Sequence, residues 1–362
     1  MSAPGYHGTT TIVNTHSPLQ VARRRGWDVA YAKGCEICDV RPAHYPNEPC
    51  RINASEANTT GIAGAVAAAK AADIVVLFLG ADQTTEAEGF DRHSLRLVGA
   101  QEALLQAVLA VSSHVVLVLV NGGPVDVSTA VESDSVVAIL EAFQPGEFGG
   151  DAMIDIMDGS ASPSAKMPVT TYFQNYTASR DIREGDLRAG SGTTYWWMRE
   201  PVLFPFGAGL EFTTFAFSWS NEPPAPEAID IPADDTELRA LSIEHSVIVA
   251  NTGARASPVV VLAFVVATPS SPSDTPRRKL FGFERLAHVA PGENATVRFA
   301  SDAGSLGVVS SSGAKLLMAG RYRIEIGSVA SPAVRELELR GASAVVEANR
   351  WAQALAGKSG VR

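Results

Sequence analysis

The 362-residue sequence has only three cysteines, few charged residues and no long apolar run. Charged residues make up 19% of the chain, and 29 basic against 39 acidic residues give a formal net charge of −10. An acidic chain without a basic run is a poor match for nucleic acid or for an anionic membrane surface. Its apolar runs, such as Ile74–Leu79 and Val115–Val120, have the length of a strand, whereas a membrane span needs about 18 apolar residues. We therefore expect no nucleic-acid partner and no membrane partner, while neutral ligands such as sugars suit this charge.

The three cysteines, Cys35, Cys38 and Cys50, are too few for a structural zinc site. Such a site needs about four ligands, and neither a second C-x-x-C nor a spaced pair of histidines follows. We interpret the cysteines as one local disulfide, for example Cys35–Cys50, and one free thiol, with the connectivity left open. No G-x-G-x-x-G follows the first strand and no P-loop is present, so no nucleotide cofactor is predicted.

The first residues, MSAPGYHGTTTIV, contain no charged leader followed by an apolar run, so this sequence predicts no signal peptide. Sequons of the form N-x-S/T nevertheless hint at a secretory history. They begin at Asn53, Asn58, Asn175 and Asn294.

Hydrophobic patterning in the first half of the chain alternates between strands and helices. Its apolar runs are continuous, which is typical of strands that are covered on both faces. Strands are predicted at Trp27–Tyr31, Asp73–Gly80, Val115–Val120 and Val136–Ala142, and helices at Ile62–Ala72, Ala100–Ser112 and Gly149–Met157. This alternation predicts βαβ units and a mostly parallel sheet.

The second half has a different pattern, which begins after the proline-rich segment Asn221–Pro232. Short, partly alternating runs separated by turn residues predict a small antiparallel β-sandwich. The runs are Ser242–Ala250, Val259–Ala267, Ala295–Phe299, Tyr322–Gly327 and Arg335–Leu339. We expect an α/β domain over residues 1–175, a connection over 176–235, the sandwich over 236–340 and a tail over 341–362. Within the tail, Ala342–Ala356 is expected to form a terminal helix.

The most informative segment is Gly80–Leu97, GADQTTEAEGFDRHSLRL, which directly follows a predicted buried strand. Ligands of parallel α/β sheets bind at the carboxyl ends of the strands. Glu86 and Glu88 are two residues apart, so on an extended loop they point the same way. A glutamate there can act as a general acid if burial or a neighbouring carboxylate raises its pKa. Asp91 and Arg92 are candidates for an ion pair that holds the loop, and a solvated acidic loop is the alternative interpretation.

Several motifs in a fixed order resemble the C-terminal part of glycoside hydrolase family 3, nearest to its β-xylosidase branch. DQTTEAEGFDR at 82–92 resembles that branch's D-x-T-x-E-x-E-G-x-D-R loop, and NGGPVDVS at 121–128 contains its GGPVDVS turn. PSAKMPVTTY at 163–172 resembles NPSGRLPVTWY, and PFGAGLEFTTF at 205–215 resembles YPFGHGLSYTTF. LFGFERL at 280–286 resembles part of the family's fibronectin-III-like domain.

This resemblance implies an α/β sandwich domain with a mostly parallel sheet, followed by an all-β fibronectin-III-like sandwich. The family consists of retaining glycosidases, in which the nucleophilic Asp lies on an N-terminal (β/α)₈ barrel and the acid/base Glu on the following domain. The sequence begins at the start of that second domain, so we expect the barrel and the nucleophile to be absent from it. By position, Glu86 is the acid/base candidate and Glu88 the alternate or a supporting carboxylate. Asp91 and Arg92 would support the loop, and no cofactor or metal is implied.

The implied function is part of a β-xylosidase-like hydrolase acting on xylan-type oligosaccharides or other glycosides. Chemistry would require a barrel, in cis in a longer transcript or in trans, and the chain alone is expected to be inactive. The alternative is a non-catalytic carbohydrate-binding or scaffold module in which Glu86 only hydrogen-bonds a sugar. The family suggests a secreted protein. The sequence leaves open xyloside against glucoside or arabinoside specificity, and also the oligomeric state.

Two departures from the family pattern are expected to loosen or re-aim packing between domains. Lys166 stands where the family motif SGRLP has Arg, and GTTYWW at 192–197 lacks both arginines of the family's G-R-T-Y-R-F. Without a barrel, we expect an exposed apolar patch around Phe90 and Phe148. We also expect Glu86 to be more exposed than a working general acid.

Overall fold

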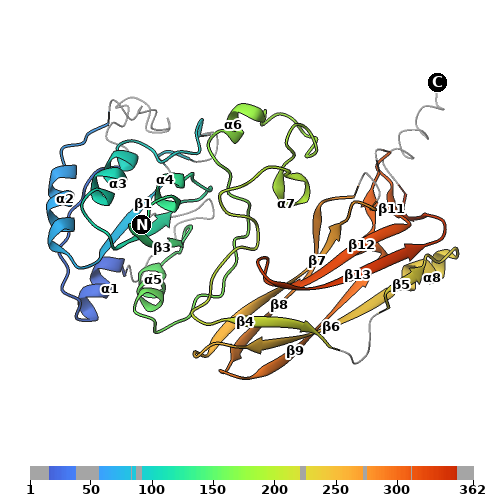
Figure 1. The fold of residues 1–362 in the computed structure, drawn as a ribbon. Helices are drawn as coiled ribbons and strands as arrows, with labels where there is room; N and C mark the ends of the chain where they lie inside the picture. The colour runs from blue at the N-terminus through green and yellow to red at the C-terminus, as the bar shows by residue number, and fades with distance from the viewer. Residues whose placement is uncertain are drawn as a thin grey trace. The chain divides into compact units, whose positions relative to one another are not determined.

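The computed structural model describes residues 16–37, 57–82, 84–86, 92–220, 226–271, 275–310 and 312–348. The chain divides into two compact units, and Figure 1 labels many of their elements. Unit 1 comprises residues 1–161 and 171–183, and unit 2 comprises residues 162–170 and 184–362. The chain thus enters unit 2, returns to unit 1 for a short segment and leaves it again. The domain boundaries expected at 175 and 235 stay predictions.

Unit 1 contains a parallel sheet of three strands in the order β1-β2-β3, as predicted. The strands are β1 (Val75–Gly80), β2 (Val115–Val120) and β3 (Val136–Glu141). The central strand β2 is apolar throughout and mostly buried, because it has a neighbour on each side. Gly80 pairs with Val120, and Leu119 with Glu141, so the three carboxyl ends meet at one edge of the sheet.

The three predicted helices of unit 1 are confirmed. They are α2 (Ile62–Ala71), α3 (Gln101–Leu109) and α5 (Gly149–Met157), and the unit also contains α1 (Pro18–Arg24), α4 (Ser128–Val131) and α6 (Tyr176–Ser179). The strand predicted at Trp27–Tyr31 is wrong. Trp27 and Val29 instead pack against the small core formed by Val21, Ala22 and Ile154, which joins α1 to α5. None of the described helices has the length and apolarity to cross a membrane.

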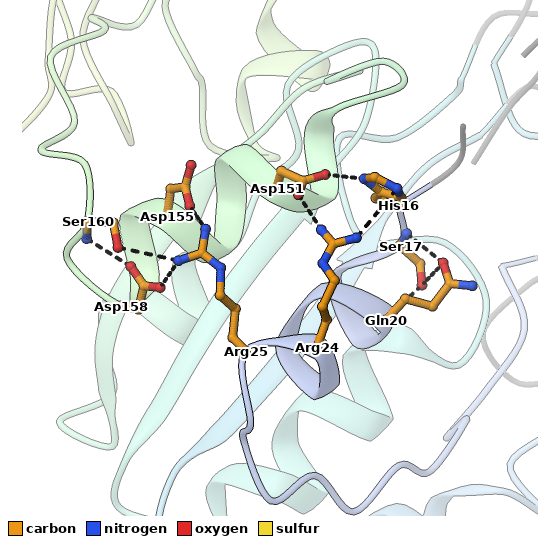
Figure 2. A network of polar contacts seen from close by, with 9 residues as sticks. All are labelled: His16, Ser17, Gln20, Arg24, Arg25, Asp151, Asp155, Asp158 and Ser160. Atoms are coloured by element: carbon orange, nitrogen blue, oxygen red, sulfur yellow. Dashed lines mark hydrogen bonds and ion pairs between the residues drawn. The ribbon is translucent and has the colours of Figure 1, made fainter. Parts of the chain in front are cut away.

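Helix α1 starts with a capping box in close contact with the first turn of α5 (Figure 2). The Ser17 side chain accepts from the Gln20 backbone N–H, and the Gln20 side chain accepts from the Ser17 backbone N–H in return. His16 Nδ1 lies 2.7 Å from Asp151 Oδ2 on α5. A Cβ atom at Gly150 would lie 1.8 Å from the His16 carbonyl oxygen, so only glycine permits this approach.

Two consecutive arginines at the end of α1 bind three aspartates on one side of α5 (Figure 2). Arg24 donates to Asp151 at 2.6 Å, and Arg25 pairs with Asp155 and, at 2.9 Å, with Asp158. The aspartates are spaced by four and three residues, which puts them on one helix face. These contacts add to the small apolar core in holding α1 against α5.

Unit 2 is a β-sandwich with an additional short sheet. The sheet orders are β5-β13-β12-β7-β8, β4-β6-β9 and β10-β11-β14. The strands are β4 (Phe215–Trp219), β5 (Ala228–Asp230), β6 (Ser242–Asn251), β7 (Ser257–Ala267), β8 (Arg278–Val289), β9 (Asn294–Asp302), β10 (Val308–Val309), β11 (Lys315–Leu317), β12 (Gly320–Gly327), β13 (Pro332–Arg340) and β14 (Ala344–Glu347), with helices α7 (Thr194–Trp197), α8 (Asp235–Ala240) and α9 (Ala303–Leu306). The predicted antiparallel sandwich is confirmed, although the short strand β5 pairs with β13 in parallel.

The continuous apolar run Val259–Ala267 lies in strand β7, and this strand is covered on both faces. Val261, Ala263 and Val265 face the main core of the sandwich. Phe264, on the opposite face, packs in a second cluster with Tyr195 and Phe206, which lie outside the sheets. A strand with two buried faces needs no polar alternation.

The helix predicted at Ala342–Ala356 is wrong over Ala344–Glu347, which forms strand β14. Leu316 and Leu317 of β11 pair with Val345 and Ala344. This partner is distant in the sequence, so local helical propensity did not decide the structure. Residues 349–356 lie outside the described part of the chain.

Candidate functional site

The end of β1 is fixed by a buried glutamine side chain that takes the place of a neighbouring strand. Gln101 Oε1 accepts from the Gly80 N–H at 2.7 Å, and Gln101 Nε2 donates to the Gly80 carbonyl at 2.8 Å. Gly80 has φ +151°, and a Cβ atom there would lie 1.9 Å from the Val120 carbonyl oxygen. The chain therefore leaves the sheet at one defined point, directly beside the turn that follows β2.

Glu86, the acid/base candidate, lies at this edge and is held by donors from the neighbouring strand's turn. Its Oε1 accepts from the N–H groups of Gly122 at 2.7 Å and Gly123 at 3.0 Å. Its Oε2 lies 2.8 Å from Nε of Arg92. All three contacts come from N–H donors, so both carboxyl oxygens act as hydrogen-bond acceptors. Glu86 is thus an anchored carboxylate rather than a member of a solvated acidic loop.

The two glycines of the GGPVDVS turn are required by this arrangement. A Cβ at Gly122 would lie 2.8 Å from Glu86 Oε1, and one at Gly123 would lie 2.7 Å from Arg92 Nη2. Neither space can take a methyl group without a shift of the carboxylate or the guanidinium. The sequence predicts that the backbone of this turn closely approaches a neighbour. That neighbour is formed by the side chains of Glu86 and Arg92.

Arg92 contacts Glu86, a partner that the sequence did not indicate, and its expected pairing with Asp91 stays a prediction. Besides its ion pair with Glu86, it donates from Nη2 to the Pro124 carbonyl at 2.9 Å. Its side chain is only 11% exposed and that of Glu86 18%. Glu88, Phe90 and Asp91 lie outside the described residues, so their predicted roles stay predictions.

The expected exposure around the Glu86 loop is found at Phe148 but not at Glu86. Phe148 is 62% exposed. Glu86 is largely covered, contrary to the expectation that the absence of a barrel leaves it open. The cover comes from unit 1 itself, because the turn at Gly122 and Gly123 packs directly on the carboxylate.

The end of β3 adds a polar cluster that the sequence did not reveal. Glu141 Oε1 accepts from the Phe143 N–H at 3.0 Å, and the Asn121 N–H donates to the Phe143 carbonyl at 3.2 Å. Burial raises the pKa of Glu141, and the hydrogen bonds from Phe143 and the Asn121 side chain partly counter this. Phe143 has φ +48°, a left-handed conformation that is uncommon for a residue other than glycine.

A glutamine from the returning segment of unit 1 holds the chain that follows the Glu86 loop. Gln174 Oε1 accepts from Ser94 Oγ at 2.8 Å and from the Leu95 N–H at 2.7 Å. Its own N–H donates to Asp126 Oδ2 at 2.6 Å. No local pattern marks Gln174, because all three partners are about 50 residues or more away along the chain.

Both departures from the family motifs are accommodated within unit 2. Lys166 pairs with Glu211 at 2.6 Å and also donates to the Gly209 carbonyl, and both side chains of the pair are nearly buried. The family motif has Ser where Glu211 stands, so the two changes complement each other. In the segment that lacks the arginines, Tyr195 stacks on Phe206 with ring centroids 4.2 Å apart. Locally, neither change leaves the packing loose.

An α/β unit with a glutamate anchored at the carboxyl edge of its parallel sheet is followed along the chain by a β-sandwich. This is the domain order that the sequence motifs imply for the C-terminal portion of a glycoside hydrolase. The chain belongs to glycosyl hydrolase family 3, because residues 1–212 match the family's C-terminal domain. Residues 259–330 match the fibronectin type III-like domain. The resemblance inferred from the motifs is confirmed.

Curated relatives are similar over nearly the whole chain. The probable exo-1,4-beta-xylosidase bxlB of Aspergillus fumigatus is 33% identical over 333 residues, which are 89% of this chain and 40% of the relative. Beta-D-xylosidase 1 of Arabidopsis thaliana is 35% identical over 354 residues, 90% of this chain and 46% of the relative. The chain therefore spans less than half the length of these relatives.

Solved structures give the same result for the fold. The GH3 exo-beta-xylosidase XlnD, solved with a xylobiose aziridine probe, has a TM-score of 0.79 and 27% identity, and the match covers 93% of this chain and 43% of XlnD. The GH3 beta-glucosidase of Bifidobacterium adolescentis has a TM-score of 0.71 and 28% identity, covering 90% of this chain and 46% of that protein.

Proposed function

We propose that this chain supplies the acid/base side of a retaining β-glycosidase site that acts on β-xylosides. A retaining mechanism uses two carboxyl groups about 5–5.5 Å apart, one as nucleophile and one as acid/base. The nucleophile would come from a barrel domain, in cis or in trans, as the greater length of the relatives suggests. Xylosides are the preferred substrate class because the curated relatives named above are xylosidases.

The observation that carries the proposal is the bonding of Glu86. Its oxygens accept from two backbone N–H groups and from Arg92, so the carboxylate is fixed and engaged as an acceptor. A group in this state is suited to hold a loop in place rather than to deliver a proton to a leaving group. We therefore assign Glu86 as the positioning carboxylate and Glu88, two residues further on, as the proton donor. The sequence alone gave these two residues the opposite order.

A second candidate function remains supported by the same contacts. A fixed carboxylate at a sheet edge also suits a non-catalytic module that hydrogen-bonds a sugar hydroxyl. Under this alternative, no barrel domain would restore activity.

Secretion is proposed from the surface of the chain. The sequon asparagines Asn58, Asn175 and Asn294 are all exposed, as an acceptor of an N-linked glycan must be. Mass spectrometry of the protein from its native source would detect glycans on them, and unmodified asparagines at all three would contradict secretion through a glycosylating route.

Activity measurements with and without a barrel separate these proposals. The chain alone should hydrolyse aryl β-xylosides no faster than buffer, because a retaining site without its nucleophile has no covalent route. Addition of a family 3 xylosidase barrel, fused ahead of residue 1, should give turnover. Turnover by the highly purified chain alone would show that a second carboxylate lies within it, and no turnover with any barrel would favour the sugar-binding module.

Leaving-group dependence in the fused protein then tests the two glutamates. Glu88→Gln should lose about 10²- to 10⁴-fold on xylosides with poor leaving groups and much less on dinitrophenyl xyloside, with azide restoring turnover. Glu86→Gln should lower turnover on both substrates alike, and azide should have no effect. The reverse pattern would return the proton-donor role to Glu86.

A further inference from the structure

We propose that Gln144 is a sugar-binding residue of this site, whose side-chain amide hydrogen-bonds a hydroxyl of the bound xyloside next to Glu86. The inference rests on the proposed function and adds a recognition residue to it. It concerns a side chain to which the sequence alone assigned no role.

Gln144 lies beside Glu86 at the carboxyl edge of the sheet. Its Nε2 lies 3.2 Å from the point that a Cβ at Gly122 would occupy, and Glu86 Oε1 lies 2.8 Å from the same point. The amide and the anchored carboxylate therefore flank one glycine at the carboxyl edge of the sheet. Gln144 is exposed, and its amide forms no hydrogen bond with any residue that the structure describes. A solvent-facing amide beside a fixed carboxylate is available to a ligand.

The backbone before Gln144 is held in an unfavourable conformation by specific contacts. Phe143 adopts φ +48°, and among the described residues only Thr194 shares a positive φ without being glycine. The Glu141 side chain accepts from the Phe143 N–H, and the Asn121 N–H donates to the Phe143 carbonyl. Strained backbone that its surroundings maintain is concentrated at binding and catalytic sites. Here the strain sets the direction in which the next residue, Gln144, leaves the sheet edge.

The backbone after Gln144 is equally restricted. Pro145 fixes its own φ, and Gly146 turns the chain with φ +71°. A Cβ at Gly149 would lie 2.5 Å from Cγ of Pro145, so the proline ring packs directly on the first residue of α5. Gln144 thus sits between two fixed points, and little backbone freedom is lost when its side chain binds a ligand.

The chemistry of the pair selects the ligand class. An amide offers two donors and an acceptor, which matches a sugar hydroxyl that both donates and accepts. The carboxyl oxygens of Glu86 next to it are acceptors for hydroxyl groups. Because Glu86 is paired with Arg92, the site has no uncompensated charge, and a neutral pyranose such as a β-xyloside fits both groups.

Side-chain amide signals of the whole chain, labelled with ¹⁵N, test the proposal during titration with xylobiose. The Gln144 signal, identified by its loss in Gln144→Ala, should shift and saturate. Gln144→Ala should raise the Kd for xylobiose about five- to tenfold, the effect of one lost hydrogen bond. Gln106→Ala is the matched control, since Gln106 is also exposed in unit 1 but lies on α3, where it bonds Glu102. It should leave the Kd unchanged.

Two outcomes overturn the inference. One is a Kd that Gln144→Ala leaves within twofold of the wild type; the other is the absence of any xylobiose binding by the chain. The proposed function is judged separately, by turnover of the chain fused to a barrel. If the fused protein turns over substrate but Gln144→Ala does not change xylobiose binding, only the inference about Gln144 is wrong. If Gln144→Ala weakens xylobiose binding but a barrel gives no turnover, only the proposed catalytic role is wrong.

Discussion

The carboxyl edge of the sheet in unit 1 and the sandwich of unit 2 are held together by different interactions. At the edge, side chains bond backbone groups, as Gln101 does with Gly80 and Glu86 with Gly122. In the sandwich, apolar side chains such as Val261 and Ile324 fill a continuous core. Close packing at the edge thus requires glycines, which have no Cβ atom. The stability of the sandwich depends instead on the volume of its buried side chains. Variants that add or remove a few atoms should distinguish the two.

The largest effect is expected from Gly80→Ala, which adds one methyl group at the edge. The new Cβ would lie 1.9 Å from the Val120 carbonyl, at a φ of +151° that suits only glycine. We expect a loss of about 4 kcal/mol or more in the stability of unit 1. Hydrogen exchange measured peptide by peptide should show faster exchange in β1 and β2 and none of it in the sandwich.

Gly64→Ala provides the control for that variant. Gly64 lies within α2, and nothing is within 4 Å of the place its Cβ would take. This substitution should stabilise unit 1 by about 0.5–1 kcal/mol, since alanine favours a helix interior. Equal effects of the two variants would contradict the close-approach argument at Gly80.

The next largest effect is expected from Ile324→Ala in the sandwich. Ile324 is fully buried on the central strand β12, and truncation leaves a cavity. A loss of about 3–4 kcal/mol in the unfolding free energy of unit 2 is expected. Val334→Ala, on the neighbouring strand β13 but 49% exposed, should change it by less than about 1 kcal/mol. A denaturant titration that shows similar losses for both would argue against volume as the basis of the sandwich.

A smaller effect, which depends on pH, is expected at His245 in the sandwich. Burial lowers the pKa of His245 to about 4 from 6.5, and the charge of Arg335 acts in the same direction. Between these values the unfolded chain binds a proton that the folded chain does not, so stability is present above pH 6.5 and is lost as the pH falls towards 4. The loss amounts to roughly 3 kcal/mol. His245→Gln should remove this part of the pH dependence in denaturant titrations, and an unchanged pH profile would contradict it.

The smallest effect is expected from Arg25→Ala at the contact between α1 and α5. Hydrogen bonds from Ser160 and the charge of Arg25 hold the pKa of Asp158 below its usual value, yet the pair lies at the surface. Exposed ion pairs contribute little and are screened by salt. The variant should lower the melting temperature of unit 1 slightly at low ionic strength and not at all at high ionic strength. A large effect that persists in salt would mean that Arg25 acts through packing instead.

Periodicity and apolar runs correctly predicted the strands and helices that pack through broad apolar surfaces, where no single partner residue decides the structure. The strands of unit 1 and helix α5 are found at or within a few residues of the expected bounds. Prediction failed where a distant partner decides. At Ala344–Glu347 a strand formed on β11, and Trp27 packed on a helix core rather than in the sheet. Strand β8 was not among the expected strands, because polar residues interrupt its apolar pattern.

The candidate site divides in the same way. The loop with Glu86 and the glycine turn were recognisable because motif residues are contiguous. The positive φ of Phe143 carried no signal, since glycine is the residue that normally indicates such a turn. Gln174 carried none either, because its role exists only once residues far apart have folded together. Contacts of that kind depend on the tertiary fold, and no local pattern contains them.

The return of the chain to unit 1 over Thr171–Arg183 has a consequence for biosynthesis. The ribosome delivers β1, β2 and β3 first, then residues of unit 2, and only afterwards Gln174. Until that residue has left the exit tunnel, Leu95 and Asp126 lack the partner that joins them in the mature protein. The nascent sheet therefore emerges before its carboxyl edge can form the hydrogen bonds with Gln174. These bonds form only after the first residues of unit 2 have been synthesised. A chain released from a ribosome stalled before Gln174 would contain the sheet without the Gln174 hydrogen bonds at its edge.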